Sequence, residues 1–156
     1  MTRKKVLAAG KFDILHLGHL AYLRQAKDLA GSDGTLVVII ARDDTIEKER
    51  GAPPVFPQEQ RRKLVEALEM VDEAVIGYDN EDHSAIVIDI KPDIVALGYD
   101  QNANRVHLKE SLNKAGLEVR IARLKKKKAD GLCSSTKIRK RIIAYYKENG
   151  SIPGME

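Results

Sequence analysis

The sequence is poor in cysteine and lacks long apolar runs, and each shortage excludes a class of protein. Its single cysteine, Cys133, excludes an internal disulfide and a cysteine metal cluster. No apolar run approaches the roughly 20 residues that a membrane-spanning helix needs. The run that follows the basic residues 1–5 is too short for a signal peptide. We therefore expect a cytoplasmic protein with no membrane partner.

Aromatic residues are also scarce, with two Phe, five Tyr and no Trp in 156 residues. Proteins that bind single-stranded nucleic acid stack the bases on aromatic rings, and this chain has few to offer. The basic runs at residues 125–128 and 139–141 are therefore interpreted as solvated faces. A formal net charge of +4 is modest and suits a small anionic substrate. We expect no nucleic acid partner.

Apolar runs rich in β-branched residues alternate with helical patterns along the chain. Strands are expected at residues 6–9, 36–41, 74–76, 93–97 and 119–122. The run at 36–41 is apolar throughout, which is typical of a strand buried on both faces of a parallel sheet. The alternation predicts an α/β fold: a single-domain, Rossmann-like, doubly wound parallel sheet of about five strands with helices on both faces.

The connections between these strands carry further expectations. Residues 43–57, which contain three prolines, are predicted to form a long loop. Two helices have apolar residues at helical spacing that we expect to face the core: Leu64, Leu68 and Val71 in one, and Ile138, Ile142 and Tyr146 in the last. We expect one domain over residues 1–149, followed by a disordered tail at 150–156.

The stretch after the first strand contains the motif His16-x-Gly18-His19. If a helix begins near Leu17, the two histidines share one face about a turn apart. Gly18 lets a ligand approach the backbone closely, and a helix N-terminus favours bound anions. The motif therefore suits a polyphosphate, although two histidines alone also fit a chance pair on a helix face.

Other polar stretches follow the remaining strands. Arg42 and Asp43 follow the second strand, Gly98-Tyr99-Asp100 the fourth, and Ser134-Ser135-Thr136 begins the last helix. Ligands of doubly wound sheets bind beyond the carboxyl ends of the strands, so these stretches are expected to converge on one site. Neither a Gly-x-Gly-x-x-Gly fingerprint nor a Gly-x-x-x-x-Gly-Lys-Ser/Thr phosphate loop is present.

Four pieces in this order resemble the cytidylyltransferase-like family of nucleotidyltransferases: residues 10–19, 71–73, 98–100 and 134–136. The ends of the second and fourth strands are most similar to archaeal-type FAD synthases. That resemblance implies transfer of AMP from ATP to FMN, giving FAD and pyrophosphate, by direct in-line attack of the FMN phosphate. It also implies a divalent cation such as Mg²⁺ carried on the triphosphate, and a homodimer.

Two other functions stay open at this point. Glycerol-3-phosphate cytidylyltransferases share the motifs, so a CTP-dependent transfer to a polyol phosphate is one alternative. Those enzymes carry an arginine where this chain has Glu69-Met70. The other is a non-catalytic nucleotide-binding or RNA-binding module, because a fold does not fix a function.

The resemblance assigns roles to individual residues. The expected catalytic residues are His16, His19 and Lys11, and no residue is assigned to a metal. The expected nucleotide-binding residues are Gly10, Lys11, Phe12, His16, Leu17, Gly18, His19, Gly98, Asp100, Ser134, Ser135 and Thr136. The acceptor side is expected at Arg42, Asp43, Arg61 and Arg62. Alternatives for single residues are a solvated Lys11, a turn-forming Asp100 and a Ser135 that only caps the last helix.

Overall fold

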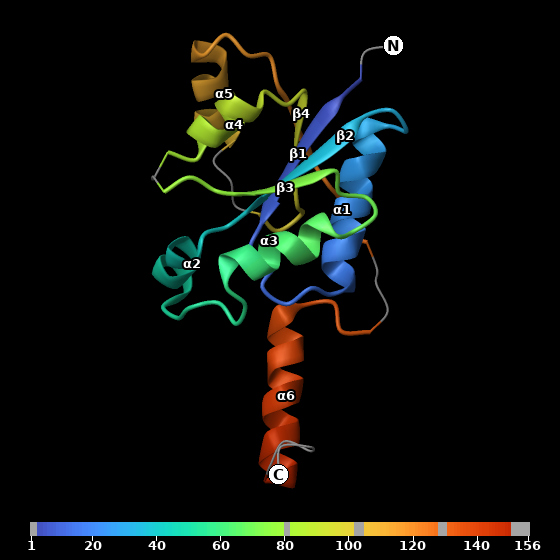
Figure 1. Cartoon of the computed structure of the whole chain (residues 1–156), viewed down its shortest axis with the longest axis vertical. Coiled ribbons are helices and arrows are strands. Elements are labelled where there is room, and N and C mark those ends of the chain that lie inside the picture. The colour runs from blue at the N-terminus through green and yellow to red at the C-terminus, as the bar shows by residue number, and fades with distance from the viewer. Residues whose placement is uncertain (1–2, 80–81, 102–104, 128–130, 151–156) are drawn as a thin grey trace.

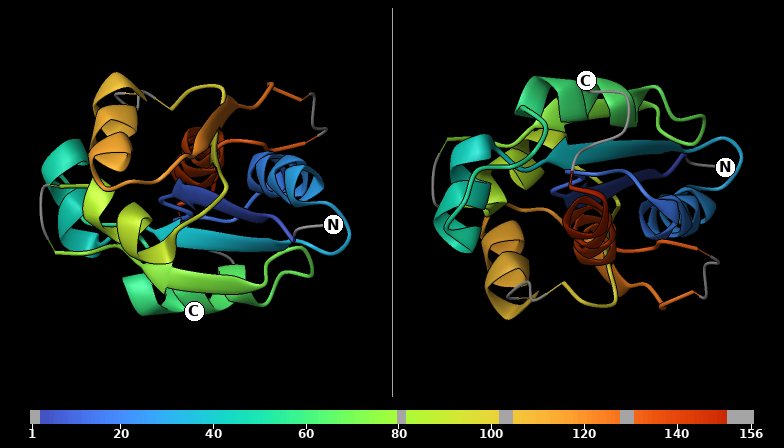
Figure 2. Two further views of the ribbon diagram at one scale, coloured as in Figure 1. Left: turned by 90° about the horizontal axis from the view of Figure 1, so that it is seen from above. Right: turned by 90° about the horizontal axis from the view of Figure 1, so that it is seen from below.

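The computed structural model describes residues 3–79, 82–101, 105–127 and 131–150, and these contain a five-stranded parallel sheet in the order β3-β2-β1-β4-β5 (Figures 1 and 2). In chain order the elements are β1 (Lys5–Gly10), α1 (Leu17–Ala30), β2 (Thr35–Ile40), α2 (Asp43–Arg50), α3 (Gln58–Glu66), β3 (Glu73–Ile76), α4 (Ser84–Ile90), β4 (Ile94–Leu97), α5 (Arg105–Lys114), β5 (Arg120–Arg123) and α6 (Ser135–Asn149). The expected doubly wound α/β fold is confirmed.

The sheet is covered on both faces because side chains alternate along its strands. Val6 and Ala8 of β1 pack in one core with α1 and α3, whereas Leu7 between them packs in a second core with α4 and α5. In β2, every residue after Thr35 is buried. This continuous burial explains the apolar run that the sequence shows there.

The strand order places the loops of interest at one edge of the sheet. β1 lies between β2 and β4, with Ala8 paired to Val38 on one side and to Ala96 on the other. The chain runs outward from β1 through β2 and β3, then returns to add β4 and β5 on the opposite side. The loops after β1 and β4 therefore diverge, and doubly wound sheets bind ligands at such a point.

Two predictions for the segment between β2 and β3 are wrong. Residues 43–50 of the predicted loop form α2, which is anchored by fully buried Ile46 and ended by Gly51 at φ 78°. Acidic residues in the first turn and basic residues in the last complement the helix dipole. In α3, Leu64 is exposed, and the inward positions belong to Arg61 and Val65, whereas Leu68 and Val71, which follow the helix, pack in the core as predicted. An inward arginine cannot be found from an apolar pattern.

The expected inner face of the last helix is also wrong. α6 projects from the rest of the molecule (Figure 1) and contains no buried residue. Ile142 and Tyr146 are 56% and 51% exposed. α6 ends at Gly150, whose φ of 67° is a left-handed conformation that favours glycine. The rest of the predicted tail, residues 151–156, lies outside the described residues. Among the described helices, none is long and apolar enough to cross a membrane.

Candidate active site

The two histidines of the motif lie at the start of α1, beyond the carboxyl end of β1. His16 is the N-cap: its Nδ1 accepts a hydrogen bond from the amide of Gly18 at 3.0 Å, and its own amide donates to Nδ1 of His19 at 3.3 Å. The two rings stack with their centroids 3.7 Å apart. Since each Nδ1 is an acceptor, each neutral ring carries its proton on Nε2. Neither Nε2 has a hydrogen-bond partner in the described part of the chain, so both are available to a ligand.

The surroundings keep both rings neutral. Burial, with a smaller contribution from His16, lowers the pKa of His19 to about 4. Burial also lowers the pKa of His16. At neutral pH the pair therefore offers two uncharged N–H donors beside the positive end of the α1 dipole. Capping and ligand binding are compatible in His16, because the cap uses only Nδ1.

The loop between β1 and α1 places one aromatic ring in the core. Phe12 is 2% exposed and has a φ of 50°. Its ring fills the space beside Gly10, where an added Cβ would lie only 2.9 Å from it. The Lys11 ammonium is exposed and forms an ion pair with Glu49 of α2 at 3.2 Å.

Asp13 holds this loop to the segment before α3. Its carboxylate is 4% exposed and accepts hydrogen bonds from the amides of Val55 and Phe56, both at 2.9 Å. It also forms ion pairs with Arg139 of α6 at 2.7 Å and Arg50 of α2 at 3.4 Å. Burial raises the pKa of Asp13, but these amide and guanidinium partners outweigh burial and hold it below its usual value. Asp13 is therefore a charged bracing residue.

The start of α6 meets the start of α1. An added Cβ on Gly18 would lie 2.6 Å from the carbonyl oxygen of Cys133, so only glycine permits this approach. The N-cap of α6 is Ser134, whose Oγ accepts from the amide of Lys137 at 3.1 Å. The alternative that Ser135 caps the helix is therefore wrong: Ser135 is its first residue. Two helix N-termini thus converge, and both favour an anion between them.

The loop after β4 is fixed to the end of β1 by Gln101, which was not among the predicted site residues. Its side-chain amide donates to the carbonyl of Ala9 at 2.6 Å and accepts from the amide of Gly98 at 2.8 Å. Arg123 also donates to the Gly98 carbonyl, at 3.1 Å. No apolar pattern or charge run marks these two residues, so sequence reasoning missed them.

Asp100 is exposed beside this clamp. Burial raises the pKa of Tyr22, and Asp100 adds to that rise. The Tyr22 hydroxyl donates to the carbonyl of Ala96 at 2.7 Å and contacts the backbone of Ala9. The Asp100 carboxylate therefore lies near Tyr22, whose hydroxyl bridges the backbones of β1 and β4.

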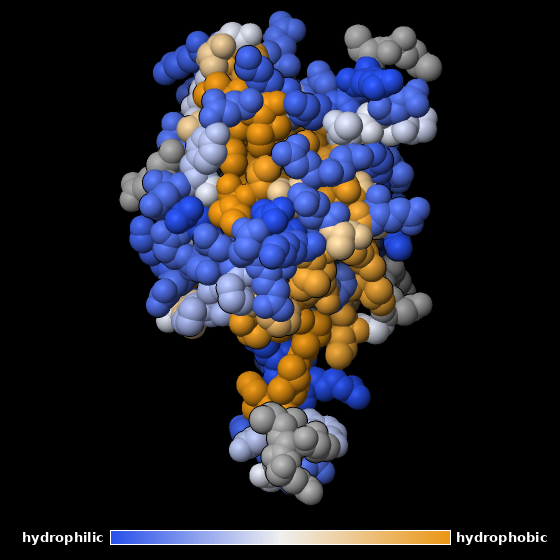
Figure 3. All heavy atoms as spheres, viewed as in Figure 1, coloured by the Kyte–Doolittle hydropathy of each residue, from blue (hydrophilic) through white to orange (hydrophobic). Residues whose placement is uncertain are grey.

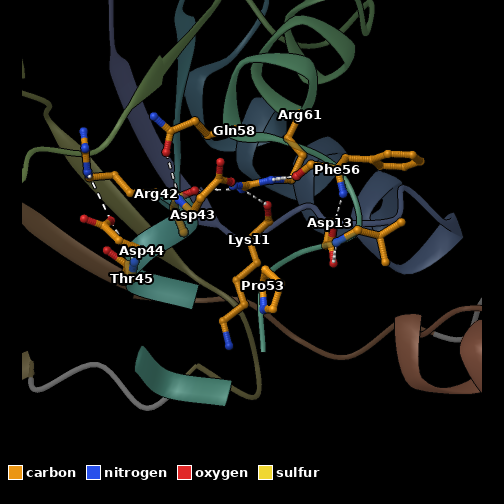
Figure 4. Close-up of polar contacts among 12 residues, drawn as sticks. Lys11, Asp13, Arg42, Asp43, Asp44, Thr45, Pro53, Phe56, Gln58 and Arg61 are labelled. Atoms are coloured by element: carbon orange, nitrogen blue, oxygen red, sulfur yellow. Dashed lines mark hydrogen bonds and ion pairs between the residues drawn. The ribbon is translucent and has the colours of Figure 1, made fainter. Parts of the chain in front are cut away.

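Arg61 lies inside the protein and does not face the site as a free cation. It is fully buried, and its guanidinium donates to the carbonyls of Lys11 and Ala41, both at 2.7 Å, and Phe56 at 2.9 Å (Figure 4). It also pairs with Asp43 at 2.7 Å. These partners occupy the guanidinium. Arg61 therefore holds the loop after β1 in place from the protein interior, through the carbonyl of Lys11.

The other two arginines expected on the acceptor side are also paired within the protein. Arg62 contacts Glu59 at 2.6 Å and Glu66 at 3.2 Å along the surface of α3. Arg42 contacts Asp44 at 3.3 Å and is 26% exposed, close to the end of β2. The structure therefore places Arg42 and Asp43 at the carboxyl end of β2 and Arg61 beside Lys11 and Asp43, with its guanidinium occupied, whereas Arg62 pairs along the surface of α3.

The described residues contain no group of three His, Cys, Asp or Glu side chains able to hold a metal ion. A hollow of about 480 Å³ lies away from the histidines, next to residues before β4 and at the start of β5. Lining residues such as Asp93 and Arg120 flank the amino ends of these strands, so this hollow is not part of the site.

Comparison with known proteins agrees with this geometry. The Cytidylyltransferase-like family profile matches residues 7–141, which extend from β1 into the start of α6. The chain belongs to the cytidylyltransferase-like family. The family match includes the histidine pair, the Gly98–Asp100 loop and the start of α6, and so it covers every part of the site described above.

Curated relatives show which members of the family this chain is similar to. The chain is 46% identical to a FAD synthase of Ferroglobus placidus, with 90% of this chain and 88% of that protein covered. It is 45% identical to a FAD synthase of Methanobrevibacter smithii, over 89% of this chain and 90% of that one. The similarity to archaeal FAD synthases expected from the motifs is confirmed.

A solved structure from Thermoplasma volcanium, described as a lipopolysaccharide core biosynthesis protein, is similar in both sequence and fold. It is 41% identical, has a TM-score of 0.72, and covers 80% of this chain and 98% of its own.

Proposed function

We propose that this chain is a FAD synthase: it transfers AMP from ATP to FMN and releases pyrophosphate. The observation that carries the proposal is the convergence of two helix N-termini around two neutral histidines, in a chain 46% identical to a FAD synthase over most of its length. A triphosphate placed there meets N–H donors and the positive ends of two helix dipoles.

The proposed reaction is one direct displacement. A phosphate monoester has a second pKa near 6, so the FMN phosphate is already an anion at neutral pH and needs no general base. The enzyme has to align the FMN phosphate with the α-phosphorus of ATP. It also has to stabilise the negative charge on the phosphate oxygens in the transition state. In this proposal Nε2–H of His16 and His19 and the amides at the start of α6 donate to the phosphates.

The remaining assignments follow from this placement. The backbone at Gly10, Lys11, Phe12, Leu17 and Gly18 lines the phosphate side, and Asp100 accepts from the ribose or base. Ser134, Ser135 and Thr136 approach the phosphates from the opposite helix. The Lys11 ammonium must leave Glu49 to reach a phosphate. The acceptor then lies toward Arg42 and Asp43.

The wider context is proposed in the same terms. The substrate is ATP with a divalent ion such as Mg²⁺ on its triphosphate oxygens, since the described residues offer no cage of their own. We propose that residues 1–149 act as one domain in a cytoplasmic homodimer with no nucleic acid or membrane partner. Transfer of CMP to a polyol phosphate and a non-catalytic module are not favoured, because the similar curated proteins are FAD synthases.

Four substrate pairs test the proposal. The protein is incubated with Mg-ATP or Mg-CTP and with FMN or glycerol 3-phosphate, and FAD and pyrophosphate are followed. We expect both products from ATP with FMN alone. Turnover with CTP and glycerol 3-phosphate only would overturn the assignment. The absence of turnover with every pair, together with salt-sensitive RNA binding, would favour the non-catalytic module.

A further inference from the structure

The segment between α2 and α3 contains an apolar loop, residues 52–57, with the sequence Ala-Pro-Pro-Val-Phe-Pro and no polar side chain. Pro53 is exposed, Phe56 is half-buried, and Val55 is 58% exposed. Figure 3 shows apolar side chains on the surface of the body beside the start of α6. Contiguous apolar surface that stays exposed suits a ligand with an apolar face.

The backbone of the apolar loop is held firmly by the protein. The amides of Val55 and Phe56 donate to the buried carboxylate of Asp13 (Figure 4), and Arg50 donates to the carbonyl of Pro53. The prolines restrict the backbone further, because each fixes its own φ. The polar groups of the loop are thus used inside the protein, and side chains are what it offers to a ligand. A surface that is already ordered loses little conformational entropy on binding.

One end of the contact network joins the apolar loop to the nucleotide side of the site. The same oxygen of Asp13, Oδ2, accepts from the amide of Val55 at 2.9 Å and from the guanidinium of Arg139 at 2.7 Å. Arg139 comes three residues after Thr136 in α6. Because both groups bind one atom, Val55 lies beside the helix start that is proposed to donate to the phosphates.

A second contact joins the apolar loop to the expected acceptor side. Arg61 donates to the carbonyl of Phe56 at 2.9 Å and pairs with Asp43 at 2.7 Å. The side-chain oxygen of Gln58, which follows the loop, accepts from the amide of Asp43 at 2.8 Å. The apolar loop therefore lies between the start of α6 and the residues at the carboxyl end of β2.

Tyr99 offers another exposed ring, but on a different side of the site. It is 51% exposed, and the ammonium of Lys126 lies 5.4 Å from the centroid of its ring. It precedes Asp100, which the proposed function assigns to the ribose or base of ATP. The surface next to the acceptor-side residues is therefore the apolar loop.

FMN has two chemically different ends. Its phosphate needs N–H donors, whereas its isoalloxazine ring is flat and largely apolar, and a ribityl chain separates the two. We propose, on the basis of the function proposed above, that the apolar loop binds the isoalloxazine ring and that Val55 contacts it. The ring then packs against residues 53–56 while the phosphate reaches the histidine pair.

Flavin binding to three variants of the full chain tests this contact. Riboflavin and FMN are titrated separately, and the change in flavin fluorescence gives the dissociation constants. Val55→Ala should weaken the binding of both flavins about fivefold, because it removes apolar contact area. Val55→Asp should weaken it at least about tenfold, because a carboxylate loses its hydration against the ring. The KM for ATP should not change in either variant.

Val106→Asp is the matched control, since Val106 is 68% exposed on α5, which packs on the sheet face opposite to α1 and α3. It should bind both flavins like the native protein. Asp13 holds residue 55 through its backbone amide, so the variants keep that hydrogen bond. Circular dichroism and melting temperature verify that they fold.

The outcomes separate the ring contact from the proposed reaction. FAD formation by the native protein, with equal flavin affinities in Val55→Asp and Val106→Asp, would overturn the ring contact and leave the proposed function. Weaker binding of FMN but not of riboflavin in Val55→Asp would also overturn the contact, because it would show repulsion of the phosphate. Riboflavin binding that depends on Val55, without any FAD formation, would support the contact and overturn the proposed function.

Discussion

The two sides of the site differ in whether their polar groups are already used within the protein. On the side formed by α1, α6 and the loop after β4, Nε2 of His16 and of His19 has no partner among the described residues, and Asp100 is exposed. On the α2 and α3 side, Arg61 is occupied by three carbonyls and Asp43. Free donors suit a ligand, whereas a satisfied guanidinium suits a scaffold. Substitutions of these groups on the first side should therefore lower the enzymatic activity, and substitutions of these groups on the second side should lower the stability of the protein.

His16→Asn should have the largest effect on activity, and it tests whether the two sides of the site differ as described. Asparagine is a good N-cap, so this variant keeps an acceptor for the start of α1 while it removes the Nε2–H donor. We expect the kcat/KM for FAD formation to fall by about 10²–10³-fold, as for loss of one preorganised donor. The melting temperature should stay close to that of the native protein.

His16→Ala is the control for the cap. It removes both functions of the ring, so it should lose the same activity and also about 1 kcal/mol of stability. Near-native turnover in His16→Asn would contradict the assignment of this ring to the phosphates.

Arg61→Met should give the largest stability effect. It leaves the carbonyls of Lys11, Ala41 and Phe56 without their donor and separates Asp43 from its partner. We expect a loss of about 2–4 kcal/mol in the free energy of unfolding, below the largest values for buried pairs because Asp43 is partly exposed. Urea denaturation measures it. A variant that kept native stability but lost FMN binding would place Arg61 on the acceptor side after all.

A smaller effect should appear in the pH dependence of stability. The pKa of His19 falls from 6.5 to about 4 on folding, so between these values the unfolded chain binds the proton more readily. The contribution of His19 to stability is therefore complete above pH 6.5 and is lost as the pH falls toward 4. His19→Gln should show a shallower loss of urea stability than the native protein between pH 7 and 5. Parallel losses in the two proteins would contradict a neutral, buried His19.

The smallest effect is expected for Arg62→Ala, next to Arg61 on the same helix. Arg62 lies at the surface, and its ion-pair partners among the described residues are Glu59 and Glu66. Surface ion pairs contribute little. We expect the free energy of unfolding and the kcat/KM to be unchanged within error. A large fall in either would remove the distinction between the two arginines.

The sequence predicts the sheet and the motifs well because both depend on local patterns. The buried run of β2 and the glycine between the histidines each follow from neighbours in the chain. The predictions are wrong where contacts between residues far apart in the sequence determine the position of a side chain. Arg61 lies inside the protein because the carbonyls of Lys11 and Ala41 meet it there. The apolar pattern of α6 correctly predicts an amphipathic helix but cannot show that its apolar face lies outside the body.

The histidine pair can be observed directly by long-range ¹H–¹⁵N NMR, since the chain has only four histidines. At pH 7 we expect His16 and His19 to be neutral, with the proton on Nε2 and an acceptor nitrogen at Nδ1. Addition of a non-hydrolysable ATP analogue with Mg²⁺ should shift both Nε2 resonances and leave the other two histidines unchanged. Protons on Nδ1, or Nε2 resonances that ignore the analogue, would contradict a site in which this pair donates to the triphosphate.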